Sequence, residues 1–433
     1  MGGVCVEQAA KRNDLIEEEF ENSPVPPQNR KSLFSVTMVW VGFPMIITSA
    51  VTGATLVQGL GFGRGLAAMI LGNLLLFAYV GLLSALGAKN GLNFAMLASR
   101  TFGKRGYMFP SGLLSTLVIG WFAVQTGLTG TTLAGTFPVN PTVIAIVAGV
   151  LYLLLTLIGI RALSFIGILS APLFVILGLY VAIEAVGSGQ AIWSYQGNPE
   201  IALSFGVAVT LVFALFVDSG TLTADFTRWA KNRGHATFAT FSAFPVANLV
   251  AMLIGGIIAA SSSGTGDLFG AIAAKGGWLS AVAILFLFVN LGSVCSHCLY
   301  NAAVGWSSIV KGNMRVLAVI LGIVGIVLAA LGVWNYFIDW LNLLGVIVPP
   351  IGTIMIVDHY VTRRNDATAD DQMRAKPFIA WLLGSTAALI ANSYFPDVST
   401  AVIGIVVSAF AYWLISLNES TVTTADLTAK SDV

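Results

Sequence analysis

The sequence predicts an all-α integral membrane protein, and three observations lead to this class. Of the 433 residues, 57% are hydrophobic and only 9% are charged, whereas soluble domains usually carry about 25% charged residues. The mean hydropathy is +0.87. Apolar stretches of roughly 20 residues, the length that crosses a bilayer, recur along the chain. A soluble globule could not cover its surface with so few polar groups, so most of the chain is expected to lie in lipid.

Twelve stretches are long and apolar enough to be candidate spans. The connections inside 141–186 and 377–417 are very short, so a count of eleven or thirteen stays open. The twelve spans are expected at 34–58, 66–87, 107–135, 141–160, 163–186, 201–227, 237–260, 278–305, 314–331, 333–356, 377–395 and 397–417.

The basic residues orient these spans. With the N-terminus inside, the cytoplasmic loops hold 14 of the 21 Lys and Arg residues, and the outside loops hold two, Arg64 and Lys275. The other five lie in the tails. Cytoplasmic loops are enriched in Lys and Arg, and an error of one span would mix the two groups of loops. The prediction is therefore twelve spans in the cell (inner) membrane, with both termini cytoplasmic.

Polar tails flank the membrane part. Residues 1–30 are polar and acidic and lack the apolar region of a signal peptide, so they are expected to form a solvated cytoplasmic tail. Residues 31–420 would form the transporter domain, and 421–433 a second cytoplasmic tail. The net charge of +1 gives no overall field for nucleic acid. The expected partners are a small molecule and the lipid bilayer, with no obligate protein partner.

Two spans contain breaks. Gly42-Phe43-Pro44 lies within the first span, where proline removes a helix hydrogen bond. Asp218-Ser219-Gly220-Thr221 interrupts the sixth. Five spans separate the breaks, so spans one and six run in opposite directions. This pattern indicates an inverted repeat of spans 1–5 and 6–10, with spans 11–12 appended and a binding site at the midplane. A packing kink is the alternative at each break.

Asp218 is the residue that most needs an explanation. A carboxyl at mid-span costs roughly 2.5–3.5 kcal/mol on insertion scales and marks a functional site by default. A carboxyl capped by nearby backbone N–H groups at the break is the structural alternative.

The eighth span carries a polar stripe that must face the protein interior. Its offsets of 0, 3, 4, 7 and 11 put these residues on one helical face. His297 is a candidate proton carrier, with a hydrogen-bonded structural histidine as the alternative. Cys295 and Cys298 flank it, but a structural zinc site needs four convergent ligands, so no transition metal is expected. The stripe consists of Asn290, Ser293, Val294, His297 and Asn301.

The third span has Trp121 and Gln125 four residues apart, on the same face. An aromatic plate beside an amide suits a flat heterocycle that stacks on the ring and forms hydrogen bonds along its edge. A tryptophan in a helix interface, with the glutamine bonded across helices, explains the pair almost as well. The pair indicates a site together with Phe216 and Asp218 on the sixth span.

Other function classes lack their motifs. Gly59 to Arg64 (GLGFGR) ends a span and follows no strand, so it is no dinucleotide fingerprint. No convergent nucleophile or metal set points to an enzyme. Two broken spans suit a transporter that works by alternating access better than they suit a channel. A receptor would ordinarily append a signalling domain. The prediction is a secondary transporter without a cofactor.

The chain resembles the nucleobase–cation symporters of the cytosine permease and hydantoin permease type over about 30–420. The motifs that carry this resemblance are Pro24-Val25-Pro26, TGATLVQGLGF (52–62), ILGNLLL (70–76), GAKNGLNFAMLASRTFG (87–103), GWF (120–122), SGTLTADFTRW (219–229) and IVPPIGTIMIVDHY (347–360) with Arg363-Arg364.

The resemblance implies a LeuT-like five-plus-five fold in which spans 1, 2, 6 and 7 rock against spans 3, 4, 8 and 9. A flat base would lie between Trp121 and Phe216. The implied cation site consists of Gly42, Met45, Asn290 and Ser293, with sodium as the ion. The expected substrate site consists of Ile46, Trp121, Gln125, Phe216, Asp218, Ser219, Gly220 and Cys295.

The chain departs from that family at several site positions. Val294 stands where a second hydroxyl usually follows Ser293, which puts sodium coupling in doubt. Cytosine permeases have Ser at the position of Asp218 and Asn at that of Cys295, whereas Gln125 follows the hydantoin permease pattern. The expected function is symport of cytosine or a related nucleobase with a cation, sodium being favoured over a proton. The alternative is a permease for a cyclic ureide or guanidine compound (hydantoin, allantoin, creatinine), proton-coupled through Asp218, with His297 as a second proton candidate.

Overall fold

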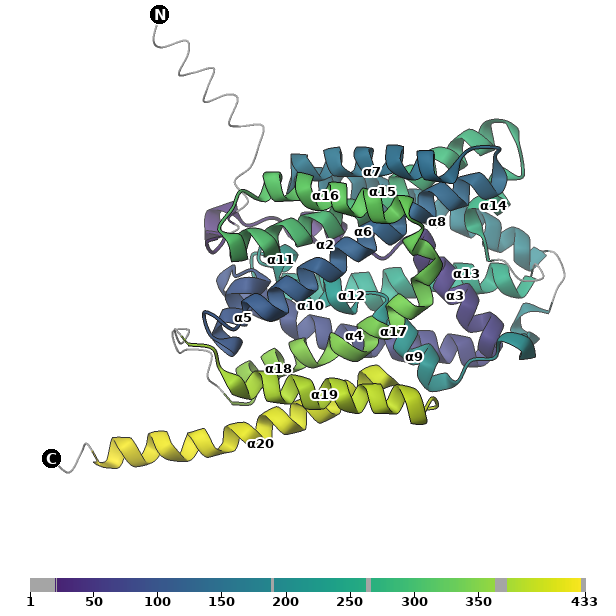
Figure 1. The fold of residues 1–433 in the computed structure, drawn as a ribbon. Coiled ribbons are helices and arrows are strands. Elements are labelled where there is room, and N and C mark those ends of the chain that lie inside the picture. Colours follow the sequence, from purple (N-terminus) through teal and green to yellow (C-terminus); the bar gives the residue numbers. More distant parts are fainter. Residues whose placement is uncertain (1–19, 21, 188–190, 262–265, 363–371, 430–433) are drawn as a thin grey trace, which may run out of the picture.

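The computed structural model describes residue 20 and residues 22–187, 191–261, 266–362 and 372–429. Their regular elements are helices, and an isolated β-bridge joins Lys31 to Ala230. The long helices run side by side in a bundle (Figure 1). The first half contains η1 (Pro27–Asn29), α2 (Leu33–Gly42), α3 (Ile47–Leu60), α4 (Phe62–Asn90), α5 (Phe94–Phe102), α6 (Met108–Thr136), α7 (Pro141–Ile158), α8 (Ile160–Gly187), η2 (Ile192–Ser194) and η3 (Pro199–Ile201). The second half contains α9 (Phe205–Ala214), α10 (Val217–Thr221), α11 (Ala224–Thr227), α12 (Arg233–Phe241), η4 (Ser242–Asn248), α13 (Leu249–Ser261), α14 (Leu268–Ala273), α15 (Gly277–Val310), α16 (Met314–Ala330), η5 (Val333–Tyr336), α17 (Phe337–Ile347), α18 (Pro349–Tyr360), α19 (Ala375–Tyr394) and α20 (Thr400–Ala429).

Each of the twelve expected spans coincides with a helix or with a broken run of helices. Within the described residues, eight helices are long and apolar enough to cross a bilayer, or nine if the bent pair α2 and α3 counts as one span. The sixth span is divided among α9, α10 and α11, and the ninth is the 17-residue α16. The last helix continues to Ala429, beyond the span end expected at 417, so it enters the segment expected to be a tail.

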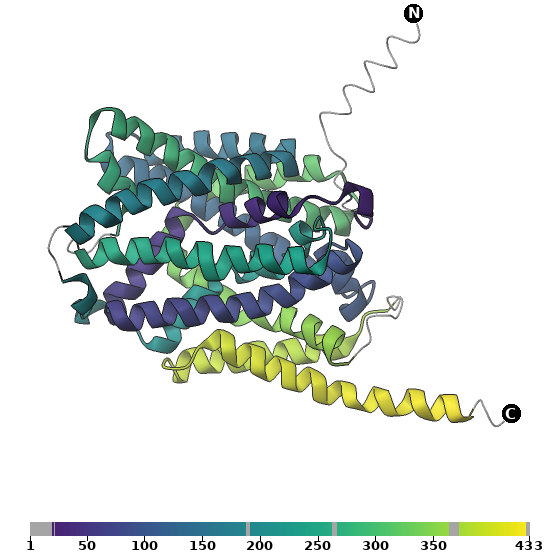
Figure 2. The ribbon, with the colours of Figure 1, turned by 180° about the vertical axis from the view of Figure 1, so that it is seen from behind.

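The described parts of the two chain ends lie at the same end of the bundle. The segment before α2 and the C-terminal end of α20 are both on the left in Figure 1 and on the right in Figure 2. The connecting helix α5 and the end of α18 lie there too, whereas α14 lies at the opposite end. This arrangement agrees with an even number of crossings between the two tails.

The described part of the N-terminal segment is largely exposed, but some of its residues contact the bundle. Val25 is 1% exposed, and its N–H donates to the Gly91 carbonyl over 2.9 Å. The Phe20 carbonyl accepts a 2.6 Å hydrogen bond from Arg228 Nη1, and the Phe20 ring packs edge-on against Trp229. The segment is held because its Val25 N–H donates to the carbonyl that follows α4, while its Phe20 carbonyl accepts from the Arg228 side chain that follows α11.

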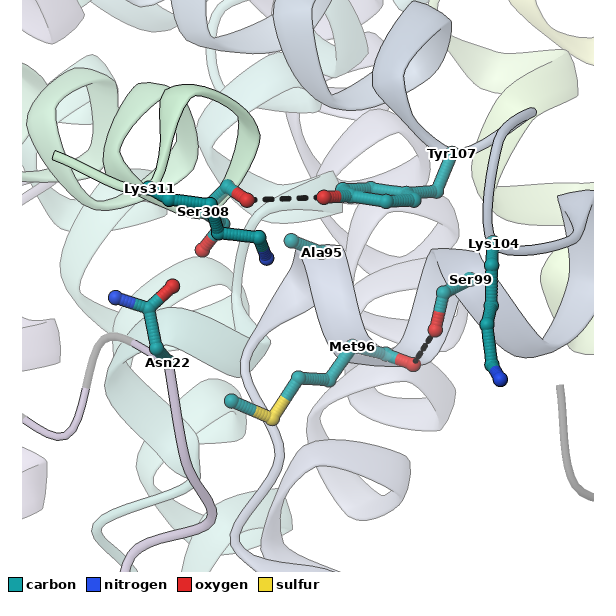
Figure 3. A pocket seen from close by; sticks show the side chains of 8 residues that line it. All are labelled: Asn22, Ala95, Met96, Ser99, Lys104, Tyr107, Ser308 and Lys311. Atoms are coloured by element: carbon teal, nitrogen blue, oxygen red, sulfur yellow. Dashed lines mark hydrogen bonds between the residues drawn. The ribbon is translucent and has the colours of Figure 1, made fainter. Parts of the chain in front are cut away.

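The same segment reaches a cavity of about 360 Å³ at this end of the bundle (Figure 3). Asn22 lines it opposite the end of α15, and Tyr107 closes it by donating a 2.9 Å hydrogen bond to the Ser308 carbonyl. The other lining residues are Ala95, Met96, Ser99, Lys104 and Lys311. Two lysines line this cavity, and none of its lining residues belongs to the interrupted spans.

A buried polar cluster attaches the last spans to this end. Asp358 at the end of α18 is 1% exposed and accepts hydrogen bonds from Thr101 (2.9 Å) and Tyr412 (2.5 Å). Arg374, just before α19, lies 3.7 Å from the same carboxylate and donates to the Thr101 carbonyl. Because Tyr412 belongs to α20, this one carboxylate holds together α5, α18 and the appended helices.

Candidate functional site

The first span is interrupted where the sequence places Pro44. Helices α2 and α3 meet at an angle of 54°. Ile46, 1% exposed, has extended backbone (φ −127°, ψ 157°) and precedes α3. The Pro44 carbonyl accepts bonds from the Ile46 N–H (2.9 Å) and the Ser49 hydroxyl (2.8 Å). The break therefore leaves the Gly42 and Met45 carbonyls and the Ile47 N–H to find partners outside the span.

Asn290 of α15 supplies most of those partners. Its Oδ1 accepts a bond from the Ile47 N–H over 2.9 Å, and its Nδ2 donates to the Met45 carbonyl over 2.6 Å. The same Nδ2 lies 3.1 Å from the Ser170 hydroxyl on α8. One buried amide thus caps the start of α3 and connects spans one, five and eight.

Ser293, one turn further on α15, donates a longer bond of 3.4 Å to the Gly42 carbonyl. Gly42 lies so close to Gly167 of α8 that a Cβ atom at this position would collide with the Gly167 backbone. Val294, next to Ser293, is 2% exposed and adds no oxygen. The structure thus brings together Gly42, Met45, Asn290 and Ser293, and their cation-binding role stays a prediction.

The sixth span is interrupted twice, and Asp218 lies between the interruptions. Phe216 leaves the helical region (φ −134°, ψ 14°) between α9 and α10. Asp218 is fully buried, and its Oδ1 accepts a 2.7 Å bond from the Ser219 N–H. Its Oδ2 is buried without a hydrogen-bond partner. Gly220 fits because a Cβ atom there would collide with the Val80 side chain of α4. One carboxylate oxygen is therefore held by the local backbone, as in the capping alternative, and the other has no hydrogen-bond partner.

Trp121 and Gln125 of α6 lie against this break and against the first one. The Trp121 side chain neighbours the Asp218 carboxylate, yet its buried Nε1 has no well-aligned acceptor. Gln125 is fully buried, and its Oε1 accepts a 2.6 Å bond from the Thr48 hydroxyl of α3. Its Nε2 is buried without a partner. The two residues thus lie where both interrupted spans meet α6.

Aromatic side chains enclose the same region. The Phe216 ring lies 5.3 Å from that of Phe43 in the first break and 5.8 Å from that of Phe244. Trp121 instead meets Phe337 edge-on at 5.9 Å. Phe216 therefore packs against two rings and Trp121 against one, and their role as the two faces of a ligand sandwich stays a prediction.

The polar stripe of the eighth span faces the interior as expected. His297 is fully buried, its Nδ1 lies 2.6 Å from the Ser293 carbonyl, and its ring lies 5.2 Å from Phe43. Cys295 is buried 3.6 Å from the Thr126 hydroxyl and 3.8 Å from the Phe122 carbonyl. Cys298 is the thiol that neighbours Ser219 and Asp218. In the described part of the chain, no group of three or more His, Cys, Asp or Glu residues could hold a metal ion.

Four further residues lie in this region, although the sequence analysis did not assign them to the substrate site or the cation site. Thr48 follows the break, so its position beside Pro44 was a usable signal. Cys298 lies three residues from Cys295, on a neighbouring face of the same helix. Ser170 and Phe337 carry no local signal, because only the packing of α8 and α17 brings them to the site.

Comparison with known proteins shows which family this chain matches. Residues 24–391 match the family of permeases for cytosine/purines, uracil, thiamine and allantoin. The cytosine permease of Escherichia coli (strain K12) is 31% identical over 418 residues, which cover 95% of this chain and 97% of the relative. The hydantoin permease of Microbacterium maritypicum is 22% identical, with 81% and 77% covered.

Solved structures share the fold. Mhp1, a nucleobase-cation-symport-1 family transporter in a closed conformation with bromovinylhydantoin bound, has a TM-score of 0.76 and 18% identity, covering 93% of this chain and 96% of Mhp1. A Na⁺-coupled sialic acid symporter in a substrate-bound outward-open state has a TM-score of 0.69 and 14% identity, with 94% and 92% covered. The predicted all-α, LeuT-like fold class is thereby confirmed.

Proposed function

Because this chain belongs to the family of permeases for cytosine/purines, uracil, thiamine and allantoin, we propose that it is a secondary active symporter that imports a small planar nitrogen heterocycle, cytosine or a related nucleobase. The family makes the chain a multi-pass membrane transporter and not an enzyme. Import by alternating access, the nucleobase substrate and the cation are our proposals.

One observation carries the substrate proposal. Trp121 Nε1, Gln125 Nε2 and Asp218 Oδ2 are buried polar atoms without hydrogen-bond partners, and they come from the two spans that meet at the sixth-span break. Each such atom costs roughly 1–3 kcal/mol when it is left unpaired in an interior. A planar heterocycle with donors and acceptors on its edge would remove this cost, while Trp121 and Phe216 offer aromatic faces for stacking.

The coupling ion is the second part of the proposal, and no cofactor is needed. The convergence of Gly42, Met45, Asn290 and Ser293 supports sodium, because each of the four residues brings an oxygen atom to the first break. Two contacts weaken it: the Met45 and Gly42 carbonyls already accept bonds from span-eight donors, and Val294 adds no ligand. A proton carried by Asp218, with His297 as the second candidate, is the alternative.

A second substrate class is favoured by a specific residue. Gln125 follows the hydantoin permease pattern, and the Mhp1 structure contains a bromovinylhydantoin. A cyclic ureide such as hydantoin or allantoin, or a cyclic guanidine compound such as creatinine, could place an N–H at Asp218 Oδ2. Proton coupling through Asp218 would accompany this class.

We also propose the cell (inner) membrane as the location, with both termini in the cytoplasm. The distribution of Lys and Arg among the loops supports this orientation. The Lys104 and Lys311 pair at the bundle end shared by both tails agrees with it.

Uptake into proteoliposomes tests the proposal. Labelled cytosine, uracil, adenine, hydantoin, allantoin and creatinine would be compared under a sodium gradient, a proton gradient or neither. We expect gradient-dependent accumulation of at least one nucleobase. Accumulation of ureides alone would select the second class, and no accumulation of any compound would refute both.

A further inference from the structure

Thr48 connects the first break to the amide of Gln125. It is the second residue of α3, directly after the interruption, and it is fully buried. Its hydroxyl donates a 2.6 Å hydrogen bond to Gln125 Oε1. This bond joins two helices that are 77 residues apart in the sequence, so it forms only when α3 lies against α6.

The bond also determines what Gln125 offers to the site. A carboxamide carries one acceptor oxygen and two donor N–H groups. Its oxygen is bonded to Thr48, so the buried Nε2 is left without a partner. Asp218 Oδ2 is an unpaired acceptor, because Oδ1 is held by the Ser219 N–H. The site therefore presents a donor from α6 and an acceptor from α10.

We propose that Thr48 is a specificity-determining positioning residue, which holds Gln125 so that the site binds a heterocycle with a ring N–H directly beside a carbonyl group. In this arrangement the ring N–H donates to Asp218 Oδ2 and the carbonyl accepts from Gln125 Nε2. The proposal rests on the proposed function and narrows its substrate class. A ring methylated at that nitrogen lacks the donor and leaves the carboxylate unpaired in a buried site, which such sites discriminate against strongly.

Thr48 is placed to set specificity rather than only stability. Thr48 belongs to the interrupted first span and Gln125 to α6. With the alternating access proposed above, the amide would reach its final position as these helices close together. A ligand that pairs with both Gln125 and Asp218 stabilises the closed arrangement, and a ligand that pairs with one of them does so less.

Three variants of the full-length protein test this assignment: Thr48→Val, Thr48→Ser as the matched control, and Gln125→Glu. Valine keeps the shape and removes the hydroxyl, whereas serine retains it. Glutamate still accepts the bond from Thr48 but has no N–H donor. Equilibrium binding in detergent would be measured for uracil, 1-methyluracil, 3-methyluracil and cytosine, together with the thermal unfolding temperature of each variant.

We expect Thr48→Val to weaken binding of the best unmethylated base about tenfold, the equivalent of one hydrogen bond. It should also reduce the preference for that base over its N-methylated form, whereas Thr48→Ser keeps both. Gln125→Glu should lose binding, and its thermal unfolding temperature should fall because a carboxyl is costly at this buried position.

Unchanged affinity and unchanged discrimination in Thr48→Val would overturn the role of Thr48. If Thr48→Val fails to fold, wild-type affinity in Gln125→Glu overturns the proposal equally. Wild-type protein that binds none of the four bases, although it is folded, overturns the proposed function and this assignment together.

Discussion

Both interrupted spans contain a break in the helix, but the two breaks differ in how their polar groups are paired. At the first break, the Ile47 N–H and the Met45 carbonyl are bonded to Asn290, and the Gly42 carbonyl is bonded to Ser293. At the second break, Asp218 pairs one oxygen with the local backbone and keeps the other unpaired. At the first break the exposed backbone groups are paired within the protein, whereas at the second break Asp218 Oδ2 has no hydrogen-bond partner.

This difference in pairing indicates whether a broken membrane helix has a structural role or contributes to a binding site. Buried polar groups are normally paired, so pairing across helices identifies a structural joint. Buried polar atoms without partners on neighbouring helices, here α6 and α10, mark a candidate site. By this criterion the first break is a joint that positions the second.

The largest effect on stability is expected when the Asn290 side chain, which bonds the first break, is removed. Asn290→Leu removes three hydrogen bonds and leaves the Ile47 N–H and the Met45 carbonyl buried and unpaired, which should cost about 3 kcal/mol of stability. Thermal unfolding in detergent would measure it. Asn301 is the matched control, because it is also buried on α15 but both of its side-chain polar atoms lack partners. Asn301→Leu should be nearly neutral, and equal losses in the two variants would contradict the special role of Asn290.

The next effect concerns the aromatic faces of the site. Trp121→Ala should abolish uptake while the protein stays folded, since base–aromatic stacking is worth roughly 1–3 kcal/mol. Phe216→Ala should behave likewise. Trp193→Ala is the control, because that side chain is 70% exposed in η2, outside both spans. Wild-type affinity in both site variants would exclude the proposed pocket.

A smaller effect is expected when the unpaired carboxylate is changed. Asp218→Asn should weaken binding by about 1.5 kcal/mol and alter the preference among ligands, because an amide both donates and accepts. Affinity and unfolding temperature would be measured on the same sample. A lower unfolding temperature with intact affinity would make Asp218 a cap like Asn290 and would remove the contrast between the two breaks.

The smallest structural effect belongs to Ser293, whose 3.4 Å bond to Gly42 is long. Ser293→Ala should cost no more than about 1 kcal/mol of stability. If sodium binds at the first break, substrate affinity in the wild type rises with sodium and the variant shifts this titration to higher concentration. Proton coupling would be established by three results together. Substrate affinity would not depend on the sodium concentration, uptake would rise as the outside pH falls, and uptake would be lost in Asp218→Asn.

Local sequence was sufficient for the class and the breaks. Pro44 lacks an N–H, so the first interruption followed from one residue, and Asp218 marked the second because a carboxyl is costly at that depth. The sequence did not reveal that residues around Val25 pack onto the bundle, because an apolar residue between two prolines looks the same in a solvated tail. Nor did it distinguish Cys295 from Cys298, since three residues along a helix is nearly one turn and the rotation of α15 decides which thiol meets Ser219.

The sequence by itself therefore determined that the chain lies in a membrane, where its spans run and which two of them are broken, because hydrophobic length, proline and buried charge act locally. Only the tertiary structure decided which polar atoms are paired. The Asn290 amide meets the Ile47 N–H across 243 residues, and the Thr48 hydroxyl meets Gln125 across 77. Such pairs depend on how each helix is rotated and where helices cross, and that geometry is set by the packing of the whole bundle rather than by any local pattern of residues.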